Sequence, residues 1–145
     1  MDPLKETFTR SERLCSKKDI AELFERGNSF YSFPFQIVWL ESSADMTFPA
    51  RIAVSVSKKL FKRSVKRNLI KRRIKEVYRK KKHTLYSYLE KENLRINFMI
   101  IFKGETITDY AETEKSLIKT LEKLITELEK MKNRNINQPQ RTLNS

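Results

Sequence analysis

Four cationic side chains recur at intervals of four residues in the middle of the chain: Arg67, Lys71, Lys75 and Arg79. In an α-helix this interval places successive side chains on one face, about one helical pitch apart. A row of ammonium and guanidinium groups at that spacing can follow a phosphate backbone. The chemistry that these residues can perform is therefore the binding of a polyanion, with nucleic acid as the first candidate.

The net charge of the chain is concentrated around this row. Residues 58–82 hold fourteen Lys and Arg side chains against one acid, Glu76, and so account for the whole net charge of +13. The remaining residues hold 17 basic and 17 acidic side chains. A surface that serves only solubility mixes charges of both signs, which this window does not do. A membrane-surface helix is also disfavoured, because the apolar face of the window lacks a Trp, Leu or Phe wedge.

The same window predicts a helix over about 64–82 with a separate apolar face. Ile70, Ile74 and Val77 share that face, and we expect them to dock the helix on a sheet. Two further residues flank the cationic row: Asn68 and Arg72. The aliphatic stripe fixes the rotation of the helix, so the cations are expected on a different side.

The segment before the basic window predicts one helix and a strand rich in aromatic residues. A Ser-Lys-Lys-Asp pattern caps a helix at Ser16, and Gly27 ends it. The aromatic and β-branched run 30–40 predicts a strand, which Pro34 either delays to Phe35 or displaces to a sheet edge.

Two further strands and a long helix are expected in the rest of the chain. Clean alternation over 51–57 predicts a half-buried strand, and the unbroken apolar run 98–102 predicts a central strand covered on both faces. A last helix is expected over about 109–132, with a stripe of leucines that packs on the sheet. A coiled-coil dimer through that stripe is the less favoured alternative, because the stripe spans under three heptads.

These elements predict one α+β domain, an α-β sandwich in the order α-β-β-β-α-β-α with helices packed on a mixed sheet. The expected domain covers residues 1–132, and the polar segment 133–145 is expected to be a disordered tail. The chain has no run long enough to span a bilayer and no signal-peptide pattern, so we expect a cytoplasmic protein.

Metal and nucleophilic chemistry find little support in the sequence. The single cysteine, Cys15, and the single histidine, His83, are too few for a zinc cluster. Cys15 is expected to be buried or half-buried. Neither residue is assigned a chemical role. The chain also lacks a compact Asp/Glu/His cluster for paired metal ions, so a free-standing metal nuclease is disfavoured, and no catalytic residue is expected.

The basic window resembles a known family. Ser55-Val56-Ser57-Lys58-Lys59 followed by Lys66-Arg67-Asn68-Leu69-Ile70-Lys71-Arg72-Arg73-Ile74-Lys75-Glu76 is similar to the signature of the protein subunit of bacterial ribonuclease P. The likeness extends from about Phe8 to Met131. Two positions depart from the family pattern: Leu69 replaces the second arginine of an Arg-Asn-Arg element, and Lys75 replaces a later arginine. Lysine keeps the charge but lacks the planar fork that binds phosphate through two hydrogen bonds.

The resemblance implies a fold, a function and partners. It implies a left-handed βαβ crossover, in a fold shared with the second domain of a small-subunit ribosomal protein. It implies a subunit that binds ribonuclease P RNA and precursor tRNA and assists endonucleolytic removal of the 5′ leader. The catalytic centre and its Mg²⁺ ions would be held mainly by the RNA, without an organic cofactor, a membrane or an obligate protein partner. A ribosomal or double-stranded-RNA binding protein of similar fold is the alternative.

The resemblance also implies site residues. Nine positions are expected to face RNA: Ser57, Lys58, Lys59, Lys66, Arg67, Asn68, Lys71, Arg72 and Lys75. Four positions are expected to line a cleft for the single-stranded leader: Ile20, Phe24, Gln36 and Val38. Only Phe24 among them carries a ring that can stack on a base, and structural core is an equal alternative for Ile20 and Val38. Phe30, Tyr31 or Phe33 could supply the stacking instead.

Overall fold

The computed structural model describes residues 8–43 and 46–137, except for the side chains of 135–137. A 3₁₀ helix, η1 (Arg10–Glu12), precedes α1 (Lys17–Arg26), which Ser16 caps by accepting a hydrogen bond from the Asp19 amide at 3.3 Å. The strands are β1 (Asn28–Ser32), β2 (Phe35–Glu41), β3 (Ala50–Val56) and β4 (Ile96–Phe102). The other helices are α2 (Ser64–Lys81), α3 (His83–Lys91) and α4 (Tyr110–Asn137).

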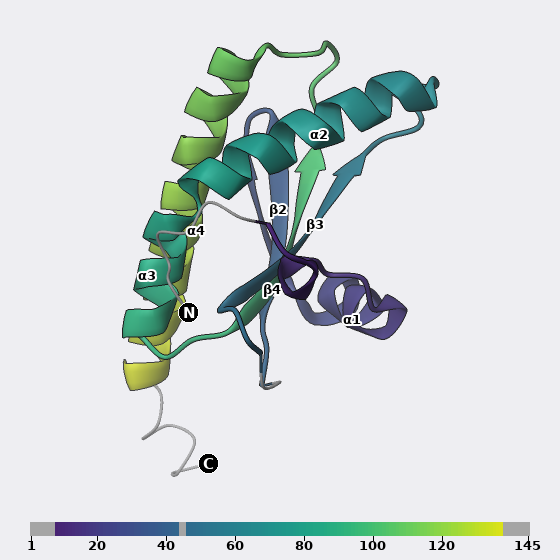
Figure 1. Cartoon of the computed structure of the whole chain (residues 1–145). Coiled ribbons are helices and arrows are strands. Elements are labelled where there is room, and N and C mark those ends of the chain that lie inside the picture. The colour runs from purple at the N-terminus through teal and green to yellow at the C-terminus, as the bar shows by residue number, and fades with distance from the viewer. Residues whose placement is uncertain (1–7, 44–45, 138–145) are drawn as a thin grey trace.

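The four strands form one mixed sheet in the order β1-β2-β4-β3. β1 pairs antiparallel with β2 and β2 with β4, whereas β3 runs parallel to β4. In Figure 1, β3 and β4 both point upward and α2 crosses in front of them, while the chain passes from β3 on the right to β4 on its left. This is the left-handed sense, opposite to about 98% of such crossovers. The predicted α+β sandwich with a left-handed crossover is confirmed.

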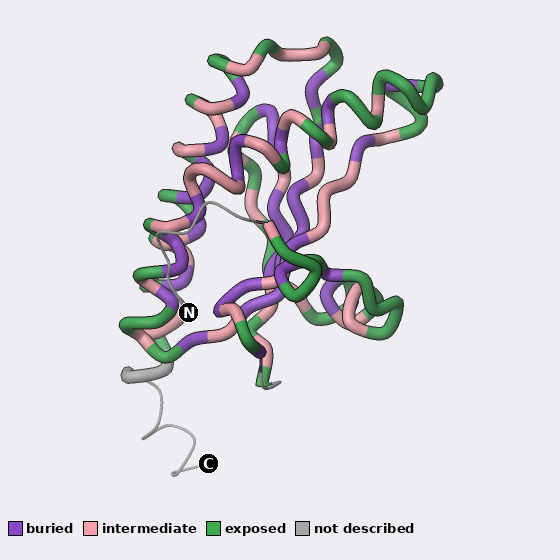
Figure 2. Tube along the Cα trace, viewed as in Figure 1, coloured by how far each residue is buried: buried purple, intermediate pink, exposed green. Residues whose placement is uncertain are grey.

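The main core lies between the sheet and the helices α2, α3 and α4 (Figure 2). Ile70, Ile74 and Val77 of α2 are 4%, 1% and 0% exposed, so the predicted aliphatic stripe does dock the helix. The leucines of α4 enter the same core: Leu117, Leu121, Leu124 and Leu128. This packing on the sheet takes up the stripe that a coiled-coil dimer would have used.

The other face of the sheet carries α1 and a smaller core. Leu23 of α1 packs with Leu14, Val38 and Met99, all buried. Helix α1 lies close to the sheet because Gly27 follows it directly. A Cβ at Gly27 would stand 3.0 Å from the Trp39 carbonyl oxygen and 3.1 Å from the Val38 side chain, both in β2. Leu14, which follows η1, joins this smaller core, whereas Glu12 of η1 reaches Lys82 and Tyr86 at the helices of the other face.

Three features differ from the expected elements. A strand does begin at Phe35, as one of the two alternatives had it, but the residues before Pro34 form a separate edge strand, β1, so this region is a hairpin of β1 and β2. α3 was not expected, although Leu85 and Leu89 recur at helical spacing and are fully buried. α4 continues to Asn137, so residues 133–137 are helical and the expected disordered tail is wrong for them. Residues 138–145 lie outside the described part, and the division at residue 132 stays a prediction.

Among the helices of the described residues, none combines the length and the apolar character needed to cross a bilayer.

Candidate nucleic-acid interface

Helix α2 carries its cations on the side that faces away from the core. Its first turns extend past the edge of the sheet at β3, and most of residues 62–69 are exposed (Figure 2). Further along the helix, Arg72 and Lys75 are exposed between the buried positions Ile70, Ile74 and Val77. The predicted separation of an aliphatic and a cationic face is therefore present.

Arg67, the first cation of the predicted row, has a partner within the chain. Its guanidinium donates to the carbonyl oxygens of Phe61 at 2.7 Å and Lys62 at 2.8 Å. These carbonyls belong to the turn that leads from β3 into α2. Arg67 therefore secures that turn, and one edge of its guanidinium is not available to RNA.

Arg79, the last cation of the row, also has a partner. Its guanidinium donates to the Glu76 carboxylate at 2.5 Å, and this hydrogen bond is the main cause that lowers the pKa of Glu76. Lys71 and Lys75, between Arg67 and Arg79, have no carboxylate partner among the described residues. The four cations thus share one face, but Arg67 and Arg79 are held by partners within the chain, whereas Lys71 and Lys75 form no ion pair with a described residue.

The middle of the row opens into a groove of about 430 Å³, which we call the α2 groove. Its lining residues come from α2 and from the N-terminal segment, residues 8–15: Phe8, Asn68, Lys71, Arg72, Lys75, Glu76 and Arg79. Four of the nine residues predicted to face RNA are therefore brought together here. Phe8, which the sequence did not single out, supplies an aromatic wall; its ring meets that of Tyr78 edge to face at 5.9 Å.

Electrostatic crowding marks the groove as a site for an anion. Partial removal of the Lys75 ammonium from water is the main cause that lowers the pKa of Lys75, and repulsion from Arg13 and Lys71 lowers it further. A lysine held among like charges gains free energy when an anion binds beside it. The clustered positive charge therefore favours an anion in the groove.

The entry to α2 and its first turn hold four of the other predicted residues. The Ser57 hydroxyl accepts a hydrogen bond from the Lys59 amide at 3.1 Å, so Ser57 shapes the turn at the end of β3. Lys58, Lys59 and Lys66 are exposed. These lysines extend the basic surface beyond the α2 groove, whereas Ser57 stabilises the backbone of the turn.

The last part of the basic window serves the fold. Lys80 and Lys81 lie 4.0 Å from the carboxylates of Glu76 and Glu114. Lys82 is 2% exposed and forms an ion pair with Glu12, which is itself 0% exposed. Lys82 therefore does not belong to the surface charge with which it was counted. The sequence gives no sign that Lys82 and Glu12, which are far apart along the chain, form an ion pair.

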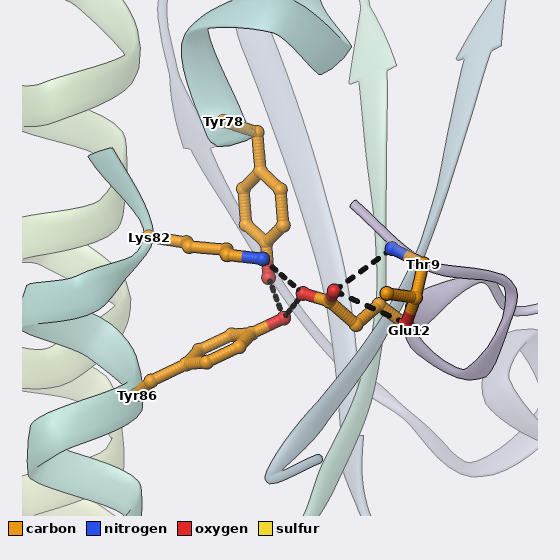
Figure 3. A network of polar contacts seen from close by, with 5 residues as sticks. All are labelled: Thr9, Glu12, Tyr78, Lys82 and Tyr86. Atoms are coloured by element: carbon orange, nitrogen blue, oxygen red, sulfur yellow. Dashed lines mark hydrogen bonds and ion pairs between the residues drawn. The ribbon is translucent and has the colours of Figure 1, made fainter. Parts of the chain in front are cut away.

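Glu12 is the centre of a buried polar network (Figure 3). Its carboxylate accepts from Lys82, from the Tyr86 hydroxyl at 2.5 Å and from the Thr9 amide at 2.9 Å. Tyr78 donates in turn to the Tyr86 hydroxyl at 3.2 Å, and burial raises the pKa of both tyrosines. The network fastens the N-terminal segment to the junction of α2 and α3.

The four residues predicted for a leader cleft fall on the α1 side of the sheet and differ in exposure. Val38 is buried and Ile20 half-buried against the small core, so both support the surface from below. Phe24 is 55% exposed. The Gln36 amide donates to the Ser29 hydroxyl at 3.0 Å. Only Phe24 of the four presents an apolar side chain to solvent.

The aromatic residues of the β1–β2 hairpin divide between the two faces of the sheet. Tyr31 lies opposite Gln36 in the register and is 52% exposed. Phe33 is 71% exposed, with its ring centroid 6.5 Å from that of Tyr31. Phe30 packs instead against the main core beneath the Lys123 ammonium. Tyr31 and Phe33 therefore remain as candidates for base stacking, and Phe30 does not.

Comparison with known proteins gives consistent matches. The family model described as Ribonuclease P matches residues 8–125. The ribonuclease P protein component of Porphyromonas gingivalis is 31% identical over 114 residues, which cover 79% of this chain and 83% of the relative. That of Petrotoga mobilis is 33% identical over 124 residues, which cover 82% and 96%.

Solved structures share the fold. The RNase P protein of Staphylococcus aureus superposes with a TM-score of 0.58 at 23% identity, covering 78% of this chain and 94% of that one. The RNase P protein from Thermotoga maritima gives 0.61 at 20% identity, covering 77% and 96%. The fold expected from the sequence resemblance is thus found in experimentally determined structures.

Proposed function

The chain belongs to the family of ribonuclease P proteins, and we propose that it binds the catalytic RNA of ribonuclease P and assists removal of the 5′ leader from precursor tRNA. The observation that supports this most directly is the α2 groove. Lys71, Arg72 and Lys75 line it without a carboxylate partner among the described residues. Such cations bind backbone phosphates and position an RNA without reading its sequence.

In this proposal the residues of the basic surface bind RNA in different ways. Lys71 and Lys75 act as point charges, whereas Arg72 can bind a phosphate through two parallel hydrogen bonds. Asn68 offers an amide that can both donate to and accept from a nucleotide. The exposed lysines at the entry to α2 continue the contact along the RNA: Lys58, Lys59 and Lys66.

The single-stranded leader is assigned to the open face of the sheet beside α1. Phe24, Tyr31 and Phe33 are exposed there or at its rim. Stacking of a base on an aromatic ring contributes about 1–3 kcal/mol. Ile20 and Val38 support this surface from below, and Gln36, opposite Tyr31 in the register, supplies an amide group.

The magnesium ions are assigned to the RNA subunit. Within the described part of the chain, no three His, Cys, Asp or Glu side chains lie close enough together to hold a metal ion. A cytoplasmic location, expected from the sequence, belongs to the same proposal.

Reconstitution with RNA tests the proposal. The purified chain alone should leave precursor tRNA intact, and it should stimulate cleavage by a cognate ribonuclease P RNA at low Mg²⁺. Metal-dependent cleavage by the protein alone, or the absence of stimulation, would overturn the assignment. Equal binding to any RNA duplex without stimulation would support the alternative of a double-stranded-RNA binding protein.

A triple variant locates the contact within the same assay. Lys71→Ala, Arg72→Ala and Lys75→Ala together should flatten the salt dependence of RNA binding by about two to three log–log units, at ~0.7–0.9 per phosphate contact. The matched control replaces three exposed lysines of α4 with alanine: Lys115, Lys119 and Lys130. If both variants flatten the slope equally, only overall charge matters and the groove has no special role.

A further inference from the structure

A second basic concavity lies beside the α2 groove. It measures about 290 Å³ and lies among the N-terminal segment, the start of α1 and the chain that leads into β3. Three arginines line it: Arg10, Arg13 and Arg51. We call it the arginine pocket. Its lining residues include no acidic side chain.

The charges of the arginine pocket are largely uncompensated. Arg10 and Arg13 are exposed and form no ion pair with any described residue. The Arg51 guanidinium forms an ion pair with the Asp19 carboxylate at an N–O distance of 3.4 Å. Hydroxyl groups of Ser16 and Thr47 also line the pocket and can donate hydrogen bonds. This combination of guanidinium and hydroxyl donors suits a phosphate group.

The pocket is fixed in place before any ligand arrives. Glu12 anchors the N-terminal segment in the protein interior (Figure 3). One residue beyond Arg13, the Leu14 amide donates to the Ile52 carbonyl oxygen of β3 at 2.7 Å. Arg10 and Arg13 therefore stand on a backbone that is held from both sides. A site prepared in this way loses little conformational entropy on binding.

Arg13 connects the arginine pocket with the α2 groove. Its guanidinium carbon lies 5.7 Å from the centre of the Phe8 ring, which forms a wall of the groove. Repulsion from Arg13 also contributes to the lowered pKa of Lys75, on the α2 side of the groove. The two concavities are thus neighbours, and their cations act on each other.

We propose that the arginine pocket binds a backbone phosphate of RNA, so that the RNA-binding surface continues from α2 across the N-terminal segment to β3. This rests on the proposed function, because the RNA in the α2 groove supplies the neighbouring phosphates. The phosphate belongs either to the catalytic RNA or to precursor tRNA, and the experiments separate the two sources.

Salt-dependent binding is the first test. The double variant Arg10→Ala/Arg13→Ala should lower the log–log slope by about 0.7–0.9, the contribution of one phosphate contact. The matched control is Lys17→Ala/Lys18→Ala, which removes the same charge from exposed positions in the first turn of α1, outside the pocket lining. The inference is wrong if the two variants lower the slope by the same amount.

The chain provides its own probe for the second test. Cys15 lines the arginine pocket, is exposed where the sequence predicted burial, and is the only cysteine in the chain. Alkylation by iodoacetamide should slow about tenfold when the RNA is present at about ten times its dissociation constant, because ~90% of the protein is then bound. The Arg10→Ala/Arg13→Ala variant, fully bound at higher RNA concentration, should lose most of that protection.

Three arms identify the source of the phosphate. Protection by ribonuclease P RNA alone assigns it to the catalytic RNA, and protection only after addition of precursor tRNA assigns it to the precursor. Full reactivity of Cys15 in both complexes overturns the inference. If the α2 triple variant loses binding while Arg10→Ala/Arg13→Ala matches its control, the arginine pocket fails and the proposed function stands. A chain that binds neither RNA refutes both.

Discussion

The two ends of α2 carry the same kinds of side chain and use them for different purposes. In the groove end, residues 66–75, Lys71, Arg72 and Lys75 face solvent without a carboxylate partner among the described residues. In the paired end, residues 79–81 together with Lys82, which directly follows the helix, every cation has a carboxylate at 4.0 Å or closer. Both stretches are rich in cations, so the placement of carboxylates separates a binding surface from a structural one: Glu76 pairs within the helix, and Glu114 and Glu12 pair from elsewhere in the fold.

Lys82 should give the largest effect in the paired end. Lys82→Met leaves the Glu12 carboxylate buried without its cation, and removal of one partner of a buried ion pair costs about 3–5 kcal/mol of unfolding free energy. Urea denaturation measures this loss. Adding Glu12→Gln should recover part of it, since the uncompensated charge is then gone. A loss below about 1 kcal/mol would mean that the pair is solvated and that the two ends differ less than the geometry indicates.

Arg67 and Lys66 separate structure from binding within the groove end. Arg67→Ala removes two hydrogen bonds to the turn before α2 and should cost about 1–2 kcal/mol of unfolding free energy. Lys66→Ala removes the same charge from an exposed neighbour and should stay within about 0.5 kcal/mol of the unchanged chain. Thermal or urea unfolding of both variants decides the matter. Equal stabilities would show that Arg67 is as available to RNA as Lys71.

Lys75 should give the smallest effect, visible as a change in its titration. Its pKa is lowered by burial and then by Arg13 and Lys71, so the folded chain binds fewer protons than the unfolded chain between the lowered and the ordinary value. Stability therefore rises with pH across that interval. Arg13→Ala should raise the pKa of Lys75, as followed by NMR of lysine side-chain carbons, while exposed Lys66 serves as the internal control. An unchanged Lys75 titration would place Arg13 too far away to join the two concavities.

Sequence patterns predicted those parts of the fold that depend on local periodicity. Ile70, Ile74 and Val77 fixed the rotation of α2 correctly, because burial of an aliphatic stripe outweighs all surface interactions of a helix. The fully apolar run 98–102 became the central strand β4 for the same reason. α3 escaped notice because it follows α2 with only Lys82 between them and without a side-chain cap, although Leu85 and Leu89 carried its signal.

Local sequence patterns could not predict contacts between specific side chains and their partners in the folded chain. Nothing near Lys82 in the sequence announces Glu12, and nothing near Arg67 shows that its guanidinium turns back to the Phe61 carbonyl. Phe8 and Arg10 look like ordinary residues of a polar terminal segment until the fold brings them beside α2 and β3. The composition of the basic surface was therefore predictable, but its boundaries and its second wall required the tertiary structure.

The ion pair between Glu12 and Lys82 also constrains the order of assembly. The two residues are 70 positions apart, and docking of the N-terminal segment closes a loop of that length. Contacts over such separations form after local ones, because the entropy of closure must be overcome first. While the chain is being synthesised, Glu12 has no buried counter-charge until Lys82 and Tyr86 have emerged from the ribosome. A nascent chain thus cannot present both concavities to RNA until α2 is complete and α3 has begun.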